Sequence, residues 1–291
     1  MPRDPNANEE PLMPFPLTPT LRRSIANGLV AVLAVGTLAW APALTAATFM
    51  PHRAVYGLSL DKSRANGAIT RAQGKLEFEW EDVCKGWTVS QRTLVQLISS
   101  EGQVIDFGWT LNSLESKDGT DYRFFIRRYN AGGDGDSQRG EAHLDGPGQG
   151  GTATYTEPTA KEIALPKGTL FPTGHSLLLL DAAVSGDLPV LRHVFDGSGD
   201  DGGLYSINAS LSAALPQDSP VNLDSPLLKN QKSWRLHLAY FGPDESVSVP
   251  EHEQFFRIFA TGVVDEMLLD YGDFTLRADL QSVEALPAPQ C

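Results

Sequence analysis

Residues 75–81, Lys75-Leu-Glu-Phe-Glu-Trp-Glu81, decide the fold class of this chain. Large apolar side chains alternate there with glutamates, which is the period of a β-strand with one face in a core and the other in water. A similar alternation returns at residues 122–127. Further strand-like segments, separated by turn residues, are residues 52–60, 88–98, 104–114, 141–144, 152–155, 190–195, 204–211, 234–240, 254–259, 263–271 and 274–283.

These segments predict an all-β domain built on one large antiparallel sheet. A flat sheet of about a dozen strands would leave long edges exposed, so we expect the sheet to curl on itself. The only helix that the pattern predicts covers residues 174–184, with Thr173 as its N-cap and Gly186 following its C-cap. This helix is apolar nearly all round, so we expect sheet to enclose it on more than one side. Such an arrangement leaves either a fully packed core or an apolar cavity between the helix and the sheet.

Residues 1–46 are predicted to be an N-terminal extension with a signal peptide, and residues 47–291 a single domain. Arg22 and Arg23 precede an apolar run that ends among small residues, which is the order of an export signal. The run is also long enough to remain as an uncleaved membrane anchor. Under either interpretation the domain lies outside the cytoplasm.

The net charge of −13 argues against a polyanionic partner. Removing residues 1–46 leaves this charge unchanged, because that stretch carries three basic and three acidic side chains. The largest basic group, Arg123, Arg127 and Arg128, has the spacing of a strand and lies among aromatic residues. We therefore expect no nucleic-acid partner.

The chain has two cysteines, Cys84 and the terminal Cys291. A terminal thiol in an exported protein, without metal-ligand neighbours, is best used in a cross-link, so we predict an intramolecular disulfide. Two unrelated free thiols are the alternative. The predicted bond would close most of the domain into one loop, which stabilises a fold by on the order of 5 kcal/mol through the unfolded state.

Motifs for catalysis and metal binding are incomplete. Residues 174–176, Gly-His-Ser, lack the final glycine and the strand–turn–helix context of a nucleophile elbow, and residues 252–253 lack the second histidine of a zinc helix. Asp196, Ser198 and Asp200 have the spacing of calcium-loop ligands, but the glutamate that would complete the loop is missing. We expect no enzyme, no cofactor and no metal site.

Three segments and the cysteine positions resemble the EipB-like family of cell-envelope integrity proteins. The segments are Asp106-Phe-Gly-Trp-Thr-Leu-Asn-Ser-Leu-Glu-Ser-Lys-Asp-Gly119, Leu165-Pro-Lys-Gly-Thr-Leu-Phe-Pro-Thr-Gly-His-Ser176 and Val194-Phe-Asp-Gly-Ser-Gly199. The resemblance runs from about residue 48 to the end, and Asp82-Val83-Cys84 combined with a terminal Cys291 is its most specific part.

This resemblance implies a periplasmic protein of Gram-negative bacteria with one intramolecular disulfide. It also implies a β-spiral of about fourteen strands around a helix, similar to lipoprotein-carrier folds. The implied role is maintenance of the cell envelope, with links to periplasmic tetratricopeptide-repeat proteins. The resemblance supplies no catalytic residues and no settled ligand.

Adjacent aromatic pairs provide a candidate ligand groove. Neighbours on a strand point to opposite faces, so one member of Phe124-Phe125 and one of Phe255-Phe256 is expected to face a groove or a partner. We add Leu177 and Leu178 of the expected helix to this groove.

Two functional hypotheses follow. The first is a non-catalytic periplasmic protein that shelters a lipid, a lipoprotein or a hydrophobic peptide in or on its curved sheet. The second is a ligand-free scaffold for an envelope partner, such as a tetratricopeptide-repeat protein. An apolar ligand that stays bound to the purified protein would distinguish the first hypothesis from the second.

Overall fold

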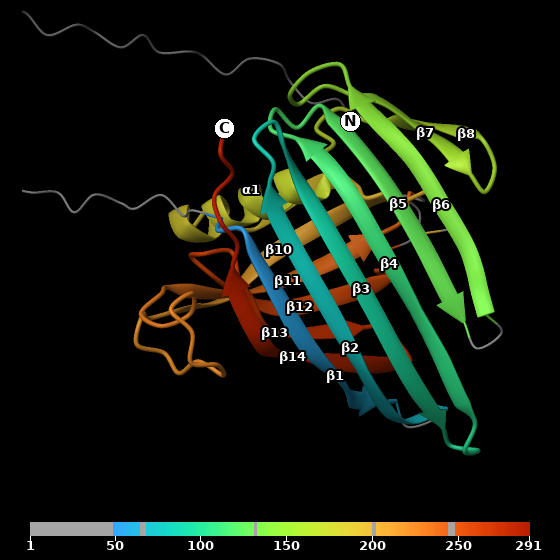
Figure 1. Ribbon diagram of the computed structural model, residues 1–291, viewed down its shortest axis with the longest axis vertical. Coiled ribbons are helices and arrows are strands. Elements are labelled where there is room, and N and C mark those ends of the chain that lie inside the picture. The colour runs from blue at the N-terminus through green and yellow to red at the C-terminus, as the bar shows by residue number, and fades with distance from the viewer. Residues whose placement is uncertain (1–48, 65–67, 131–132, 200–201, 244–247) are drawn as a thin grey trace, which may run out of the picture. The chain divides into compact units, whose positions relative to one another are not determined.

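The computed structural model describes residues 49–64, 68–130, 133–199, 202–243 and 248–291 (Figure 1). These residues belong to one compact unit, Thr45–Cys291. The expected signal peptide and Asp200 of the calcium-like loop lie outside the described residues. In the ranges given above, no helix is long and apolar enough to cross a membrane.

The described residues form fourteen strands and one α-helix. The helix is α1 (Pro172–Ser185). The strands are β1 (His52–Ser63), β2 (Ile69–Asp82), β3 (Gly86–Ser99), β4 (Val104–Ser116), β5 (Asp121–Asn130), β6 (Gly133–Leu144), β7 (Gly151–Glu157), β8 (Lys161–Leu165), β9 (Val190–Phe195), β10 (Leu204–Leu215), β11 (Ser233–Phe241), β12 (His252–Phe259), β13 (Val264–Asp270) and β14 (Phe274–Ala285).

All fourteen strands join one sheet in the order β8-β7-β6-β5-β4-β3-β2-β1-β14-β13-β12-β11-β10-β9. Every neighbouring pair is antiparallel. Strands β1 and β14, the first and last in the chain, pair with each other near the middle of the sheet, for example at Ala54 and Val283. Figure 1 shows the long strands β2 to β6 in front and β10 to β13 crossing behind them. The predicted curled, almost entirely β fold with one helix is confirmed.

Alternation explains which face of a strand such as β2 is buried. In β2, Leu76 and Trp80 are buried, whereas the intervening Glu77 and Glu79 are not. Such one-sided burial fixes the register, because a slip by one residue would turn the apolar set towards water. The residues on the inner face therefore determine how the sheet curls around its core.

The two ends of the curled sheet meet at a seam. Leu170, between β8 and α1, forms a parallel bridge with Val194 of β9. The Leu170 N–H donates to the His193 carbonyl at 2.9 Å, and the Phe195 N–H donates to the Leu170 carbonyl at 3.0 Å. This bridge pairs part of an edge that would otherwise be open to strand addition.

Aromatic rings fill the interior beside the seam. Tyr122 and Phe124 from β5 and Tyr155 from β7 pack with Phe171 and Phe195 in one buried cluster. Ring centroids of Tyr122 and Phe171 are 5.1 Å apart, and Phe124 meets Phe195 edge-on at 5.7 Å. The cluster therefore connects strands from both ends of the sheet.

Helix α1 packs on the inner side of β9 and β10 (Figure 1). Leu179, Leu180 and Ala183 are buried there against strands β9 to β12. Gly186 ends the helix in the left-handed conformation, at φ 83°, and donates its N–H to Ala182, as glycine does in the expected C-terminal motif. The prediction of Thr173 as N-cap is wrong, because Phe171 occupies that position and makes no side-chain cap.

The predicted disulfide between Cys84 and Cys291 is confirmed, with Cα atoms 5.8 Å apart. It joins the turn after β2 to the tail after β14, and β1 lies between these two strands in the sheet. The tail is also held by a 2.9 Å hydrogen bond from the Leu286 N–H to the Pro51 carbonyl. The disulfide thus links the two ends of the domain at the centre of the sheet.

Candidate functional site

An apolar cavity of about 300 Å³ lies between α1 and the inner face of the sheet. Strands on both sides of the β1–β14 pair contribute to it. Its apolar lining consists of Phe49, Leu76, Phe78, Leu179, Phe256, Ile258, Val264 and Met267. This volume is at the lower end of the roughly 300–1,000 Å³ typical of small-ligand sites. Of the two alternatives left open by the sequence, a packed core and an apolar cavity, the structure contains the cavity.

His52 and Tyr56 of β1 bring polar atoms to the cavity. The Nδ1 of His52 lies 2.7 Å from the Met50 carbonyl, so this nitrogen carries the proton and Nε2 is the acceptor. Burial lowers the pKa of His52, which keeps the ring neutral near pH 7. The Tyr56 hydroxyl donates to the Val264 carbonyl at 2.9 Å and joins β1 to β13 across the interior.

Ser176 and Gln91 are further polar groups in the lining, and each bonds to the protein itself. The Ser176 hydroxyl donates to the Pro172 carbonyl at 2.9 Å, one helical turn earlier. The Gln91 amide donates to the Thr93 hydroxyl at 3.3 Å. Because Ser176 is bonded to a carbonyl, it is not paired with a histidine as an activated nucleophile would be. This geometry suits binding better than covalent catalysis.

Glu115 of β4 positions the helix that covers the cavity. Its side chain is only 3 % exposed, and its two oxygens accept the backbone N–H groups of Thr173 and Gly174, each at 2.7 Å. A carboxylate at a helix N-terminus satisfies unpaired N–H groups and interacts favourably with the helix dipole. Burial nevertheless raises the pKa of Glu115 to about 7, although both hydrogen bonds act in the opposite direction.

His175, in the same turn of α1, is also buried. Burial and the charge of Arg192 lower its pKa to about 4, so the imidazole is neutral at physiological pH. The start of α1 therefore carries a buried carboxyl group and a buried neutral imidazole, which makes the position of the helix sensitive to changes in either side chain.

The structure does not bring the six predicted groove residues together. Phe124 is 3 % exposed in the seam cluster, whereas Phe125 lies on the outer face under the Arg139 guanidinium, 4.2 Å from its ring centroid. Phe255 is also on the outer face, stacked on His237 at 4.2 Å. Each pair is thus divided between the two faces, as alternation requires.

Of the six, Phe256 lines the cavity. Leu177 and Leu178 are half-buried, and Leu178 packs against the core on which α1 rests. The helix instead contributes Ser176 and Leu179 to the lining. Sequence reasoning missed the contributions of β1, β2 and β13. The inward positions Leu76 and Phe78 of β2 were readable from alternation, but Val264 and Met267 of β13 do not follow it.

The calcium-like loop is partly described. The Asp196 carboxylate accepts the Ser198 N–H at 2.7 Å, so it organises its own loop. Burial raises the pKa of Asp196 to about 6. Among the residues that the structure covers, no group of three or more His, Cys, Asp or Glu side chains is arranged to hold a metal ion.

The fold and the cavity together define a class of protein. It is a β-spiral, in which a nearly closed antiparallel sheet surrounds one helix and leaves an apolar space beside it. The fold is similar to the crystal structure of a beta-barrel-like protein of a domain of unknown function from Brucella abortus, with a TM-score of 0.73. That likeness covers 82 % of this chain and 99 % of the other, at 26 % sequence identity.

The family follows from sequence comparison. The EipB-like family matches residues 43–287, and the chain belongs to this family. The curated protein "Cell envelope integrity protein EipB" of Brucella abortus (strain 2308) is 27 % identical over 266 residues. The alignment covers 89 % of this chain and 92 % of that protein.

Proposed function

We propose that this protein is a non-catalytic periplasmic protein that supports cell-envelope integrity by binding a hydrophobic ligand inside its curled sheet. The role in the envelope is supported by the name of the Brucella relative. The periplasmic location is supported by that name together with the export-signal pattern in residues 1–46 and by the disulfide.

The cavity beneath α1 is the observation that carries the ligand-binding proposal. Its apolar side chains come from α1, β2, β12 and β13, so a bound chain would contact elements far apart in the sequence. Removing apolar surface from water gives about 25 cal/mol per Å², which makes an alkyl chain or an apolar peptide side chain a suitable occupant. The neutral His52 offers one acceptor, at Nε2, for a polar group at the end of such a chain.

A scaffold for an envelope partner, such as a tetratricopeptide-repeat protein, is the second proposal. Exposed apolar side chains favour it, above all Leu191 on edge strand β9, which is 60 % exposed. A binding surface of this kind would use the outside of the sheet and would not require an occupied cavity. Ligand occupancy therefore separates the two proposals.

Titration with a fluorescent fatty acid tests the cavity, with Met267→Trp as the blocking variant. Met267 lines the cavity, and the indole would fill part of the 300 Å³. Its neighbour Leu268 pairs with Phe255 on the opposite face of β13, so Leu268→Trp is the matched control.

We expect the unmodified protein and Leu268→Trp to bind the fatty acid with similar affinity, and Met267→Trp to bind it at least about tenfold more weakly, a change of about 1.4 kcal/mol. Thermal unfolding of each variant checks that the fold is intact. Equal binding by all three proteins would place the ligand elsewhere and contradict the proposal.

A further inference from the structure

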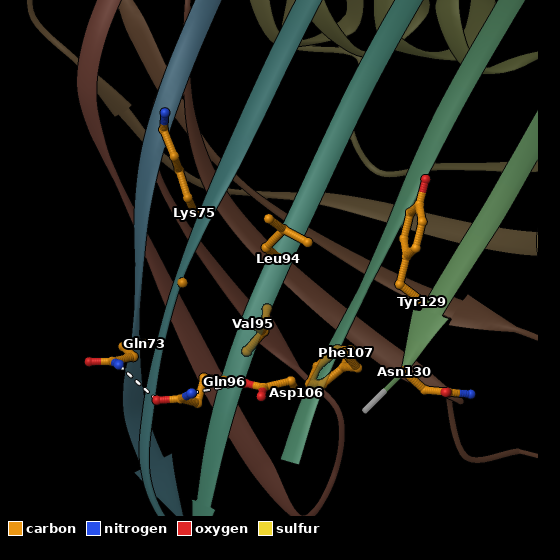
Figure 2. Close-up of a pocket in the computed structure, with 10 residues that line it drawn as sticks. Gln73, Lys75, Leu94, Val95, Gln96, Asp106, Phe107, Tyr129 and Asn130 are labelled. Atoms are coloured by element: carbon orange, nitrogen blue, oxygen red, sulfur yellow. Dashed lines mark hydrogen bonds between the residues drawn. The ribbon is translucent and has the colours of Figure 1, made fainter. Parts of the chain in front are cut away.

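A second hollow, of about 590 Å³, lies on the outer face of strands β2 to β5. Figure 2 shows its residues on neighbouring strands, with Gln73, Gln96 and Asp106 along one line and Leu94 and Tyr129 above it. The interior cavity beneath α1 shares none of these residues. The hollow is therefore a separate feature of the opposite face of the sheet.

One outward position beside the hollow carries no side chain. The register places Lys75, Leu94, Gly108 and Tyr129 side by side on β2, β3, β4 and β5. A Cβ at Gly108 would approach the Leu94 side chain to 2.7 Å and the Thr93 carbonyl to 2.4 Å. Gly108 therefore allows the Leu94 side chain to lie over the backbone of β4, between β3 and Tyr129 of β5.

A chain of hydrogen bonds borders the hollow. Gln73 Nε2 donates to Gln96 Oε1 at 2.9 Å, and Gln96 Nε2 donates to Asp106 Oδ1, also at 2.9 Å. An amide has two donor hydrogens and an acceptor oxygen, so the row keeps further donors and acceptors for a ligand. Its members fix one another's orientation, which reduces the entropy lost when a polar ligand binds.

An apolar row lies beside the polar one. Leu94 is 43 % exposed, and Tyr129 adds an aromatic ring with a polar tip. Lys75 ends the row and is paired with Glu77 at 2.7 Å, so its charge is neutralised locally. The hollow thus combines an aromatic ring, an aliphatic side chain and planar amide and carboxylate groups.

We infer that this hollow binds a glycan chain whose sugars carry N-acetyl groups. A sugar ring has a C–H face that packs on an aromatic ring, and its hydroxyls both donate and accept hydrogen bonds. An acetamido group matches the Gln73–Gln96–Asp106 row through its N–H and C=O, and its methyl group matches Leu94.

Other ligand classes fit less well. Strands β2 to β5 are each paired on both sides, so an extended peptide has no free edge here to which it can add as a strand. A polyanion would meet Asp106 and a protein of net charge −13. A neutral glycan needs neither a free strand edge nor a basic surface.

The test titrates the full exported chain with the β-1,4-linked tetramer of N-acetylglucosamine and follows backbone amide signals by NMR. We expect weak, saturable binding that shifts the amides of Gln73, Gln96, Asp106 and Tyr129. The glucose tetramer maltotetraose, which lacks acetamido groups, should bind at least about tenfold more weakly. Equal binding of the two sugars, no saturable shifts, or shifts confined to the interior cavity would overturn the inference.

Two variants locate the site. Tyr129→Ala and Gln96→Ala should each lower the affinity for the N-acetylglucosamine tetramer about tenfold while leaving thermal unfolding and fatty-acid binding unchanged. Tyr271→Ala and Gln281→Ala are the matched controls, since both residues are exposed and lie outside the hollow. Full binding by the two hollow variants, or stronger binding of an extended tetrapeptide at the same amides, would contradict the assignment.

Discussion

Glu115 has two opposing effects at the start of α1. As a carboxylate it accepts two backbone N–H groups at 2.7 Å, yet its charge is costly in a position only 3 % exposed. Its pKa of about 7 shows that the cost of burial is the larger effect. One residue from β4 therefore links the stability of the helix to pH.

The raised pKa of Glu115 determines whether the free energy of unfolding rises or falls with pH. The folded pKa of Glu115 lies above the ordinary value of 4.5, so its favourable contribution is complete below about pH 4.5 and is lost as the pH rises through about 7. We expect the free energy of unfolding to fall between pH 5 and pH 8, and the fall to be smaller in Glu115→Gln. Denaturant melts across this range measure it, and an unchanged pH profile in the variant would contradict the assignment.

Glu115→Ala is expected to lower the free energy of unfolding more than Glu115→Gln does, because alanine leaves no acceptor. In Glu115→Ala two buried N–H groups lose their acceptor, for which we expect a loss of about 2–4 kcal/mol in unfolding free energy. Glu284→Ala is the control, because Glu284 is an exposed acidic residue paired with Arg53. Equal stability of these two variants would show that Glu115 does not hold the helix.

Asp265 and Arg257 form an ion pair inside the protein. The carboxylate is 0 % exposed, and its Oδ2 lies 3.5 Å from Nη1 of Arg257, which also donates to the Pro220 carbonyl at 2.7 Å. Asp265→Ala leaves a buried guanidinium without its counter-charge, so we expect a loss of about 3–5 kcal/mol by urea unfolding. A loss below about 1 kcal/mol, as for a surface pair, would contradict this interpretation.

At the scale of elements, sequence patterns predicted most strands and located the helix. Residues 190–195, for example, were predicted as a strand, and the structure contains the same strand. Strand β8 was missed because it has five residues and its apolar positions, Ile163, Ala164 and Leu165, are consecutive and do not alternate. Strand β6 begins at Gly133, whereas the predicted strand began at residue 141. The prediction began too late because the first residues of β6 are rich in glycine and aspartate, as turns are.

The N-terminal cap of α1 shows what local patterns cannot supply. Threonine is a residue type favoured at the N-cap, but the Thr173 N–H is bound by an acceptor from Glu115, 58 residues earlier in the chain. No periodicity in the sequence connects these two positions. The six predicted groove residues are distributed over different surfaces for the same reason, since alternation gives the face of a residue but not the strand that lies opposite.

The C-terminal tail is cross-linked to the central strands by the disulfide. Because Cys291 is bonded to Cys84 across β1, we expect Cys291→Ser to lower the melting temperature, with a loss approaching 5 kcal/mol if the chain-entropy account holds. Reductant should produce the same shift in the unmodified protein and none in the variant. An equal melting temperature for the oxidised protein and the variant would mean that the bond does not stabilise the fold.

At the scale of the whole domain, the pairing of the first strand with the last sets the position of the cavity. Because β1 lies between β2 and β14, residues from the early strands face those of β12 and β13 across the interior. The number of predicted strands indicated a curled sheet, but the order of the strands within that sheet could not be read from the sequence. The cavity lining therefore became identifiable only in three dimensions.

We propose that the space beneath α1 holds a hydrophobic ligand in the cell. Native mass spectrometry of the protein exported to a bacterial periplasm, followed by organic extraction, tests it most directly. We expect the protein to have a mass two hydrogens below that of the reduced chain and to carry one extractable lipid or apolar peptide. This adduct should be lost in Met267→Trp. A ligand-free mass for the unmodified protein, with the disulfide intact, would contradict the claim and favour the scaffold.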